Sequence, residues 1–442
     1  MPQATFHFPP GFLWGTATSS HQVEGSNTNN NWSVWEQEPG CIVNGDRAGL
    51  ACDWWGGRWR QDLDRAAEAG QNAHRMSIEW SRIQPTPNHW DESALDYYRE
   101  IMRGMYDRKL TPLVTLHHFT DPIWLMNEGG WANPDTPAKF GRYARKVVEA
   151  LKDYVTLWAT INEPNLYTYF GYMDPLFPPG KKDPKLAFLV GQNLVKGHAA
   201  AYREIHDVQR EARVGIANHF NGFTPARPGF PPDSILARFS SANLNDTFPY
   251  ALKTGKYRFL GKQALIKEAV DTQDYVGFNY YTEQTVRFSP RAYKDFFSVR
   301  SFPKGAPLSE HAHLADVPDG LTRAIKWANS FGKPILILEN GVEDSTDALR
   351  PRYMLEHLMR VWHQVNENVP IKGYFHWSLV DNFEWERGWT QKWGLWGMNP
   401  ETQVRTRRPS VDLYAAICKE NAINSAMVEK FAPEIYQDLF PG

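Results

Sequence analysis

The chain has 442 residues, and its 48 lysines and arginines are balanced by 50 aspartates and glutamates. This balance, without any basic tract, argues against nucleic acid or an anionic membrane surface as a partner. No segment reaches the roughly 18 apolar residues of a membrane span, and residues 1–10 lack a signal-peptide pattern, so we expect a cytoplasmic protein.

Short apolar segments recur along the whole chain, each about as long as a strand. Near-continuous apolar runs of this kind are typical of parallel strands that are covered on both faces. We expect eight strands, at Phe12–Thr18, Asn72–Trp80, Thr111–Phe119, Thr156–Asn162, Arg213–Phe220, Asp274–Tyr281, Pro334–Glu339 and Ile371–Ser378.

Amphipathic stretches with helical spacing separate these strands. Thr136 and Pro137 are a helix N-cap followed by proline at the first helical position, which predicts a helix to about Tyr154. Further helices are expected at Arg58–Ala69, Asp91–Arg108, Pro318–Phe331 and Arg352–Asn366. Strands that alternate with helices eight times predict one closed (β/α)8 TIM barrel over residues 1–442, rather than an open sheet.

The longer irregular stretches are rich in proline, glycine and asparagine, and each follows an expected strand. They are Ser26–Asp53, Tyr172–Asp183, Pro225–Pro232 and Arg287–Asp316. Loops after the strands of a barrel build its substrate pocket, so we expect these stretches to form the walls of a cleft at the C-terminal face.

Two glutamates lie at the ends of the fourth and seventh apolar segments, Glu163 within Thr160–Pro164 and Glu339 within Ile337–Gly341. Either glutamate alone would read as an ordinary acidic residue at the start of a loop or turn. In a closed barrel, however, the fourth and seventh strands face each other across the axis. Two carboxyl groups on opposite sides of an anomeric carbon are what cleavage of a glycosidic bond requires. We therefore expect these two residues to be catalytic.

Several segments, in this order along the chain, resemble the signature sequences of the family 1 glycoside hydrolases, the β-glucosidase family. They are Phe12–Gly25, Arg75–Arg82, Thr160–Pro164, Gly277–Tyr281, Ile337–Gly341 and Trp377–Trp385. The resemblance covers about Phe8 to Ala416. It implies a retaining, exo-acting β-glycosidase in which Glu339 is the nucleophile and Glu163 the acid/base residue.

The resemblance also implies roles for the residues around this pair. Arg75 and Tyr281 are expected to keep Glu339 ionised, whereas a nearby carboxylate and an apolar surround should keep the proton on Glu163. Asn162 would bind the sugar 2-hydroxyl, with Asn279 as a further supporting residue. The residues expected to contact the sugar are Gln22, His118, Asn162, Glu384 and Trp385, with Trp377 as a stacking floor and Trp393 in the wall.

The expected substrates are terminal β-D-glucosyl residues of cellobiose, short cello-oligosaccharides and aryl or alkyl β-glucosides, with β-galactosides and β-fucosides as side substrates. Glu384 would repel a sugar 6-phosphate, which disfavours the alternative of a 6-phospho-β-glycosidase. A catalytically silent carbohydrate-binding protein is a second alternative, although such a protein would normally have lost one carboxylate. Trp124, Trp393 and Trp396 could extend the cleft wall or simply pack in the core.

No cofactor or metal is expected. His117, His118, His219 and His376 invite a metal hypothesis, but the chain has no His-Glu-x-x-His pair, no nucleophile elbow and no nucleotide-binding glycine motif. Three scattered cysteines, Cys41, Cys52 and Cys418, favour reduced thiols over a Cys41–Cys52 bridge. The expected partner is a small β-glycoside, and homo-oligomerisation is left open.

Overall fold

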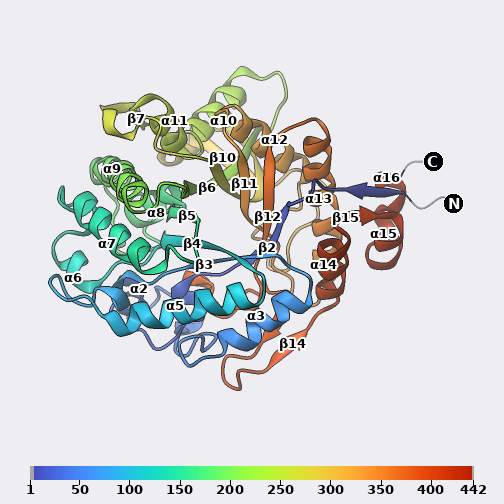
Figure 1. Ribbon diagram of the computed structural model, residues 1–442. Helices are drawn as coiled ribbons and strands as arrows, with labels where there is room; N and C mark the ends of the chain where they lie inside the picture. The colour runs from blue at the N-terminus through green and yellow to red at the C-terminus, as the bar shows by residue number, and fades with distance from the viewer. Residues whose placement is uncertain (1–3, 441–442) are drawn as a thin grey trace.

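The computed structural model describes residues 4–440, so residues 1–3 and 441–442 of the expected domain lie outside the described part. Eight strands pair in parallel in chain order, and the pairing of the last with the first closes the ring (Figure 1). They are β2 (Leu13–Ala17), β3 (Ala73–Ser77), β4 (Thr111–His117), β5 (Leu157–Asn162), β6 (Arg213–Pro225), β9 (Val276–Phe288), β11 (Ile335–Asn340) and β12 (Ile371–Trp377). The predicted (β/α)8 barrel is therefore confirmed.

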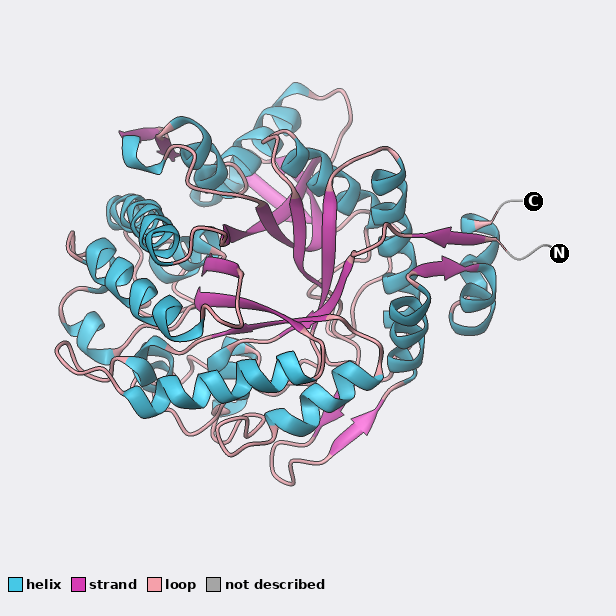
Figure 2. Ribbon diagram, in the orientation of Figure 1, coloured by secondary structure: helices cyan, strands magenta, loops and turns pink. Residues whose placement is uncertain are grey.

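Helices surround the ring on its outer side, as Figure 2 shows. They include α3 (Trp59–Glu68), α5 (Glu92–Asp107), α7 (Thr136–Leu151), α9 (Pro184–Val208), α10 (Pro231–Leu244), α11 (Thr247–Thr254), α12 (Pro318–Asn329), α13 (Arg350–Asn366) and α14 (Pro409–Glu420). The side chain of Asp91 caps α5 by accepting from the backbone N–H groups of Ser93 and Ala94. Pro137 lies in the first turn of α7, but the helix begins one residue earlier than predicted, with Asp135 rather than Thr136 at the N-cap.

The apolar core has two layers, which explains why the strands are apolar along both faces. All residues of β5 and β11 are buried. Outward-facing side chains such as Trp158 and Ile337 pack in the large clusters beneath the helices. Smaller side chains such as Ala73 and Ala159 fill the inside of the ring together with Leu338.

The loop regions contain more regular structure than the sequence suggested. Strands β6 and β9 continue past the barrel and pair with each other as far as Pro225 and Val286, and β10 (Ser298–Ser301) adds an antiparallel partner to β9. The expectation that 287–316 is irregular throughout is therefore wrong. The extended strands satisfy each other's backbone groups, a long-range pairing that local composition does not reveal.

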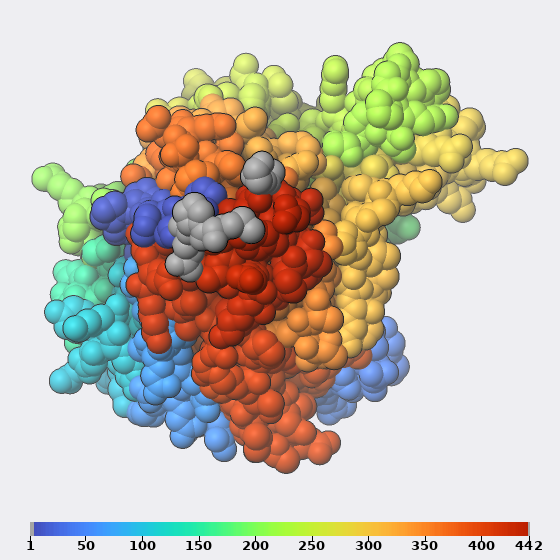
Figure 3. Space-filling model, turned by 90° about the vertical axis from the view of Figure 1, so that its right-hand side faces the viewer, coloured from blue at the N-terminus to red at the C-terminus, as the bar shows by residue number. Residues whose placement is uncertain are grey.

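The remaining elements are short. They are α1 (Ser20–Val23), α2 (Asn31–Trp35), α4 (Trp80–Ile83), α6 (Ile123–Asn127), α8 (Pro164–Tyr172), α15 (Ser425–Phe431), α16 (Tyr436–Leu439), and the antiparallel strand pairs β1 (Thr5–His7) with β15 (Ala422–Asn424), β7 (Lys256–Phe259) with β8 (Lys262–Leu265), and β13 (Trp396–Met398) with β14 (Arg405–Arg407). The first pair brings residues 5–7 beside residues 422–424, and Figure 3 shows the blue and red segments next to each other on one face.

The three cysteines all lie within the described residues and carry free thiols, as expected. Within residues 4–440, no helix is both long enough and apolar enough to cross a membrane.

Candidate active site

A cavity of about 480 Å³ lies at the C-terminal ends of the barrel strands. Both predicted glutamates line it, together with Asn162, His118, Tyr281, Trp377, Glu384, Trp385 and Trp393. The predicted residues Arg75, Asn279 and Gln22 are fully buried and do not line it. Nine of the twelve site residues predicted from the sequence therefore line one cavity, and the other three lie immediately behind its wall.

Glu339 lies at the end of β11, where two side chains hold its carboxylate. Nη1 of Arg75, in β3, donates to Oε1 of Glu339 at 2.6 Å, and the hydroxyl of Tyr281 donates to Oε2 at 2.5 Å. Burial, with a smaller contribution from the charge of Glu163, nevertheless raises the pKa of Glu339 to about 7, against the lowering effects of Arg75 and Tyr281. Arg75 and Tyr281 thus favour the ionised form of Glu339, as expected, while burial opposes them.

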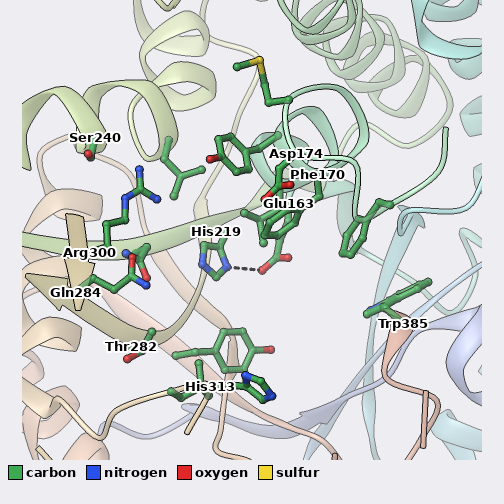
Figure 4. Close-up of a pocket in the computed structure, with 18 of the residues that line it drawn as sticks. Glu163, Phe170, Asp174, His219, Ser240, Thr282, Gln284, Arg300, His313 and Trp385 are labelled. Atoms are coloured by element: carbon green, nitrogen blue, oxygen red, sulfur yellow. Dashed lines mark hydrogen bonds and ion pairs between the residues drawn. The ribbon is translucent and has the colours of Figure 1, made fainter. Parts of the chain in front are cut away.

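Glu163 follows β5 and has a left-handed backbone conformation, with φ of 42°. The next residue, Pro164, begins α8, so the carboxylate is fixed at the junction of a strand and a helix. Its Oε1 accepts from Nδ2 of Asn279 at 2.9 Å and lies 2.8 Å from Nδ1 of His219 (Figure 4).

His219 is the residue that the sequence analysis missed, because it was considered only as a possible metal ligand. It lies in β6, lines the cavity and contacts Glu163 directly. The position of His219 in the sequence could have identified it. His219 comes near the end of the fifth apolar segment, in the position where the other segments supplied their candidates.

Asn162 connects the two glutamates through hydrogen bonds. Its Oδ1 accepts from Nη2 of Arg75 at 2.7 Å and from Nδ2 of Asn279 at 3.1 Å. Arg75 also binds Glu339, and Asn279 also binds Glu163. One continuous network therefore runs from one carboxylate to the other.

His118 lines the cavity and contacts Asn162. Its Nε2 lies 3.0 Å from Nδ2 of Asn162, and its Nδ1 has no protein partner among the described residues. Burial lowers the pKa of His118 well below its usual value, so the ring is neutral. Because the Asn162 amide donates to Nε2, a neutral ring carries its proton on Nδ1.

The segment after β12 carries Glu384 and Trp385. Burial and the neighbouring Glu386 raise the pKa of Glu384 well above its usual value. Gln22 donates through Nε2 to the backbone oxygen of Phe383 at 2.8 Å and lies 3.3 Å from Glu384. The amide of Gln22 therefore holds the segment that carries Glu384, and its expected contact with the sugar stays a prediction.

Aromatic side chains form much of the cavity wall. The ring of Trp377 stacks on His118 with centroids 6.1 Å apart, and Trp393 meets Tyr281 edge to face at 5.4 Å. Trp124 and Trp396 do not line the cavity. Trp124 packs on Trp80 and Trp396 lies against Arg65, so both are packing residues.

The other end of the cavity is built by β6, β9, β10 and α10. Phe223, Phe239 and Phe296 provide its apolar surface, and Figure 4 shows the polar side chains Ser240, Gln284 and Arg300 on this side. Across residues 4–440 there is no group of three histidine, cysteine or acidic side chains arranged to hold a metal ion.

The barrel and its pair of buried, hydrogen-bonded glutamates at the strand ends define the protein as a glycosidase. Residues 4–423 match the model of glycosyl hydrolase family 1. The chain belongs to this family.

Known proteins with the same architecture agree with this membership. The chain is 32% identical to Beta-glucosidase A of Thermotoga maritima over 445 residues, which covers 94% of this chain and 98% of the relative. It is 29% identical to a beta-galactosidase of Pyrococcus woesei over 511 residues, with 96% and 99% covered. The solved structure of a beta-glycosidase from Pyrococcus horikoshii matches with a TM-score of 0.90 and 35% identity, covering 97% of this chain and 98% of that one.

Proposed function

We propose that this glycosidase is a retaining, exo-acting β-glucosidase that also accepts β-galactosides and β-fucosides. The observation that carries the proposal is the hydrogen-bond network joining Glu163 and Glu339 in one cavity. The T. maritima and P. woesei relatives, a beta-glucosidase and a beta-galactosidase, support the glucosides and galactosides in this range.

In the proposed first step, an oxygen of Glu339 attacks the anomeric carbon while Glu163 gives its proton to the glycosidic oxygen. The bond from carbon to the leaving oxygen breaks, and a covalent glycosyl ester forms on Glu339. In the second step the ionised Glu163 takes a proton from water, whose oxygen displaces Glu339. Arg75 stabilises the Glu339 carboxylate at the start and at the end of this cycle, when that group is free and charged.

Glu384, Trp385 and His118 are proposed to bind the sugar hydroxyls, and Trp377 to stack on the ring. An anionic or hydrogen-bonding carboxyl at Glu384 suits the neutral hydroxyls of a hexose and disfavours a phosphate at C6. The nearby Glu386 adds to that negative field. The 6-phospho-β-glycosidase alternative is therefore a weaker candidate.

The direct test is hydrolysis of a panel of 4-nitrophenyl β-D-glycosides and of cellobiose by the purified protein. We expect the highest kcat/KM on the β-glucoside, lower values on the β-galactoside and β-fucoside, and little hydrolysis of the 6-phospho-β-glucoside. Preference for the phosphorylated sugar would overturn the proposed specificity. Glucose binding without turnover of any glycoside would instead favour a carbohydrate-binding protein.

A further inference from the structure

Hydrogen bonds around Glu163 fix which of its two oxygens is available for proton transfer. A guanidinium can only donate, so the atom of Asn162 that contacts Arg75 Nη2 at 2.7 Å is its oxygen. The atom of Asn279 that lies 3.1 Å from this oxygen must then be its amide nitrogen. The same nitrogen lies 2.9 Å from Oε1 of Glu163, so Oε1 accepts a hydrogen bond there.

His219 meets the same oxygen from the other side. Its Nδ1 lies 2.8 Å from Glu163 Oε1, and its side chain is 15% exposed. Figure 4 shows the His219 ring between Glu163 and the polar side chains Gln284 and Arg300 in this view of the cavity. With Nδ1–H as a donor, Oε1 accepts two hydrogen bonds and has no room left for a proton of its own.

We propose that His219 is a positioning residue for acid/base catalysis: it donates Nδ1–H to Oε1 of Glu163 and thereby confines the catalytic proton to Oε2. The proton then leaves Oε2 for the glycosidic oxygen as the bond from carbon to that oxygen breaks, and Oε2 later takes a proton from water. This inference rests on the acid/base role proposed for Glu163.

Other charged or titratable groups share the cavity with this pair. They are His118, Tyr169, Asp174, Tyr281, Asp295, Arg300, His313, Glu339, Glu384, Glu386 and Arg387, with Arg75 behind the wall. Glu163 has no direct hydrogen bond from a cation in the described network, because Arg75 binds Asn162 and Glu339 instead. His219 and Asn279 are therefore the two side chains that orient the Glu163 carboxyl group.

Two substitutions distinguish the effect of the hydrogen bond to Glu163 from the effect of the space that the His219 ring fills. His219→Leu fills a similar space without any donor. His219→Asn keeps a donor, because the asparagine amide nitrogen is as many bonds from Cβ as Nδ1 is. His206→Leu is the matched control: it removes a histidine that contacts a carboxylate of Asp274 at 3.0 Å outside the cavity. Thermal unfolding of each variant establishes that it is folded.

The readout is kcat/KM on aryl β-glucosides of graded leaving-group ability, each over a range of pH. Proton donation to the glycosidic oxygen accelerates the departure of 2,4-dinitrophenolate little and that of phenolate strongly. We expect His219→Leu to lose about tenfold or more on the phenyl glucoside and far less on the dinitrophenyl glucoside. Its basic limb moves to higher pH, since a donor to Oε1 favours the ionised carboxylate. His219→Asn should recover most of the loss.

An equal loss on all leaving groups with an unchanged pH profile would overturn the inference, as would a His219→Leu variant that behaves like His206→Leu. A parent chain that hydrolyses no β-glycoside would instead refute the proposed function. For that case, ¹⁵N spectra of histidine-labelled protein give an independent answer. The His219 signals are those present in the parent chain and absent from His219→Asn. In the parent chain they should report a proton on Nδ1, and a proton on Nε2 alone would contradict the proposed donor.

Discussion

Arg75 and Glu339 lie on opposite sides of the barrel interior, in β3 and β11, and meet at 2.6 Å with side chains that are 1% and 5% exposed. A pair this deeply buried contributes little net stability, because removing both charges from water costs about as much as their attraction returns. Its value is in placing one carboxylate at a defined position in the cavity. The predictions below follow from that placement.

Replacing Glu339 by glutamine should abolish hydrolysis while leaving the fold intact. Glutamine keeps the shape of the side chain but cannot form the glycosyl ester, so we expect kcat to fall by about 10³-fold or more. The assay is release of 4-nitrophenol from the β-glucoside, with a thermal unfolding curve as the check on folding. A folded Glu339→Gln variant with activity near that of the parent would refute the assigned nucleophile.

The pH dependence should report the environment of Glu339. Its pKa is raised to about 7, mainly by burial, and the carboxylate must be ionised to attack, so kcat/KM should fall as the pH decreases through about 7. The Tyr281 hydroxyl lowers this pKa by donating to Oε2. Tyr281→Phe removes that donor, and we expect the acid limb to move upward by about one pH unit.

The measurement is kcat/KM from pH 4 to 9 for the parent and for Tyr281→Phe. The basic limb should stay in place, because Tyr281 has no hydrogen bond to Glu163 in the described network. An acid limb that moves to lower pH in the variant would contradict the hydrogen-bond assignment.

Glu384 should decide between a free and a phosphorylated sugar. Glu384→Gln keeps the size of the side chain but replaces a carboxyl group that can ionise and accept hydrogen bonds at both oxygens, so we expect kcat/KM on 4-nitrophenyl β-glucoside to fall by about tenfold or more. At the same time, discrimination against the 6-phosphate should become weaker. The ratio of the two kcat/KM values is the quantity to measure. If this ratio is the same in parent and variant, Glu384 does not set the specificity.

The segment that carries the sugar-binding residues is held by a buried ion pair. Arg408 donates from Nη1 and Nη2 to the two oxygens of Asp381, at 2.9 and 2.8 Å, and Asp381 also accepts from the backbone of Gly394. Arg408→Met leaves a buried carboxylate without its cation, and we expect a loss of about 3–5 kcal/mol in the free energy of unfolding.

Denaturant unfolding measures this loss, and Arg407→Met is the control. Arg407 pairs with Asp412 at the surface, with both side chains about half exposed, so its replacement should change stability little. Comparable losses in the two variants would mean that the Asp381 pair does not hold the segment.

The barrel could be predicted from the sequence because its strands are marked locally. A run such as Thr156–Asn162 is apolar enough to be buried on both faces, and its end identifies the candidate Glu163. The features that could not be predicted arise from contacts between distant segments. The antiparallel β10, the contact of His219 with Glu163 and the amide of Gln22 turned toward Phe383 are of this kind.

The raised pKa of Glu339 could not be predicted for the same reason. From the sequence, Arg75 and Tyr281 were predicted as the partners of Glu339, and both residues do contact Glu339. What the sequence could not provide is the free energy of removing that carboxylate from water, which depends on how completely the assembled barrel buries it.

The central claim is that Glu339 forms a covalent bond to the sugar. A 2-deoxy-2-fluoro-β-D-glucoside with a good leaving group should trap this intermediate, because the fluorine slows both steps whereas the good leaving group speeds only the first. Mass spectrometry of the digested protein is then expected to find one added fluoroglucosyl group on the peptide that contains Glu339. A label on a different peptide, or no label together with inverted product anomers, would contradict it.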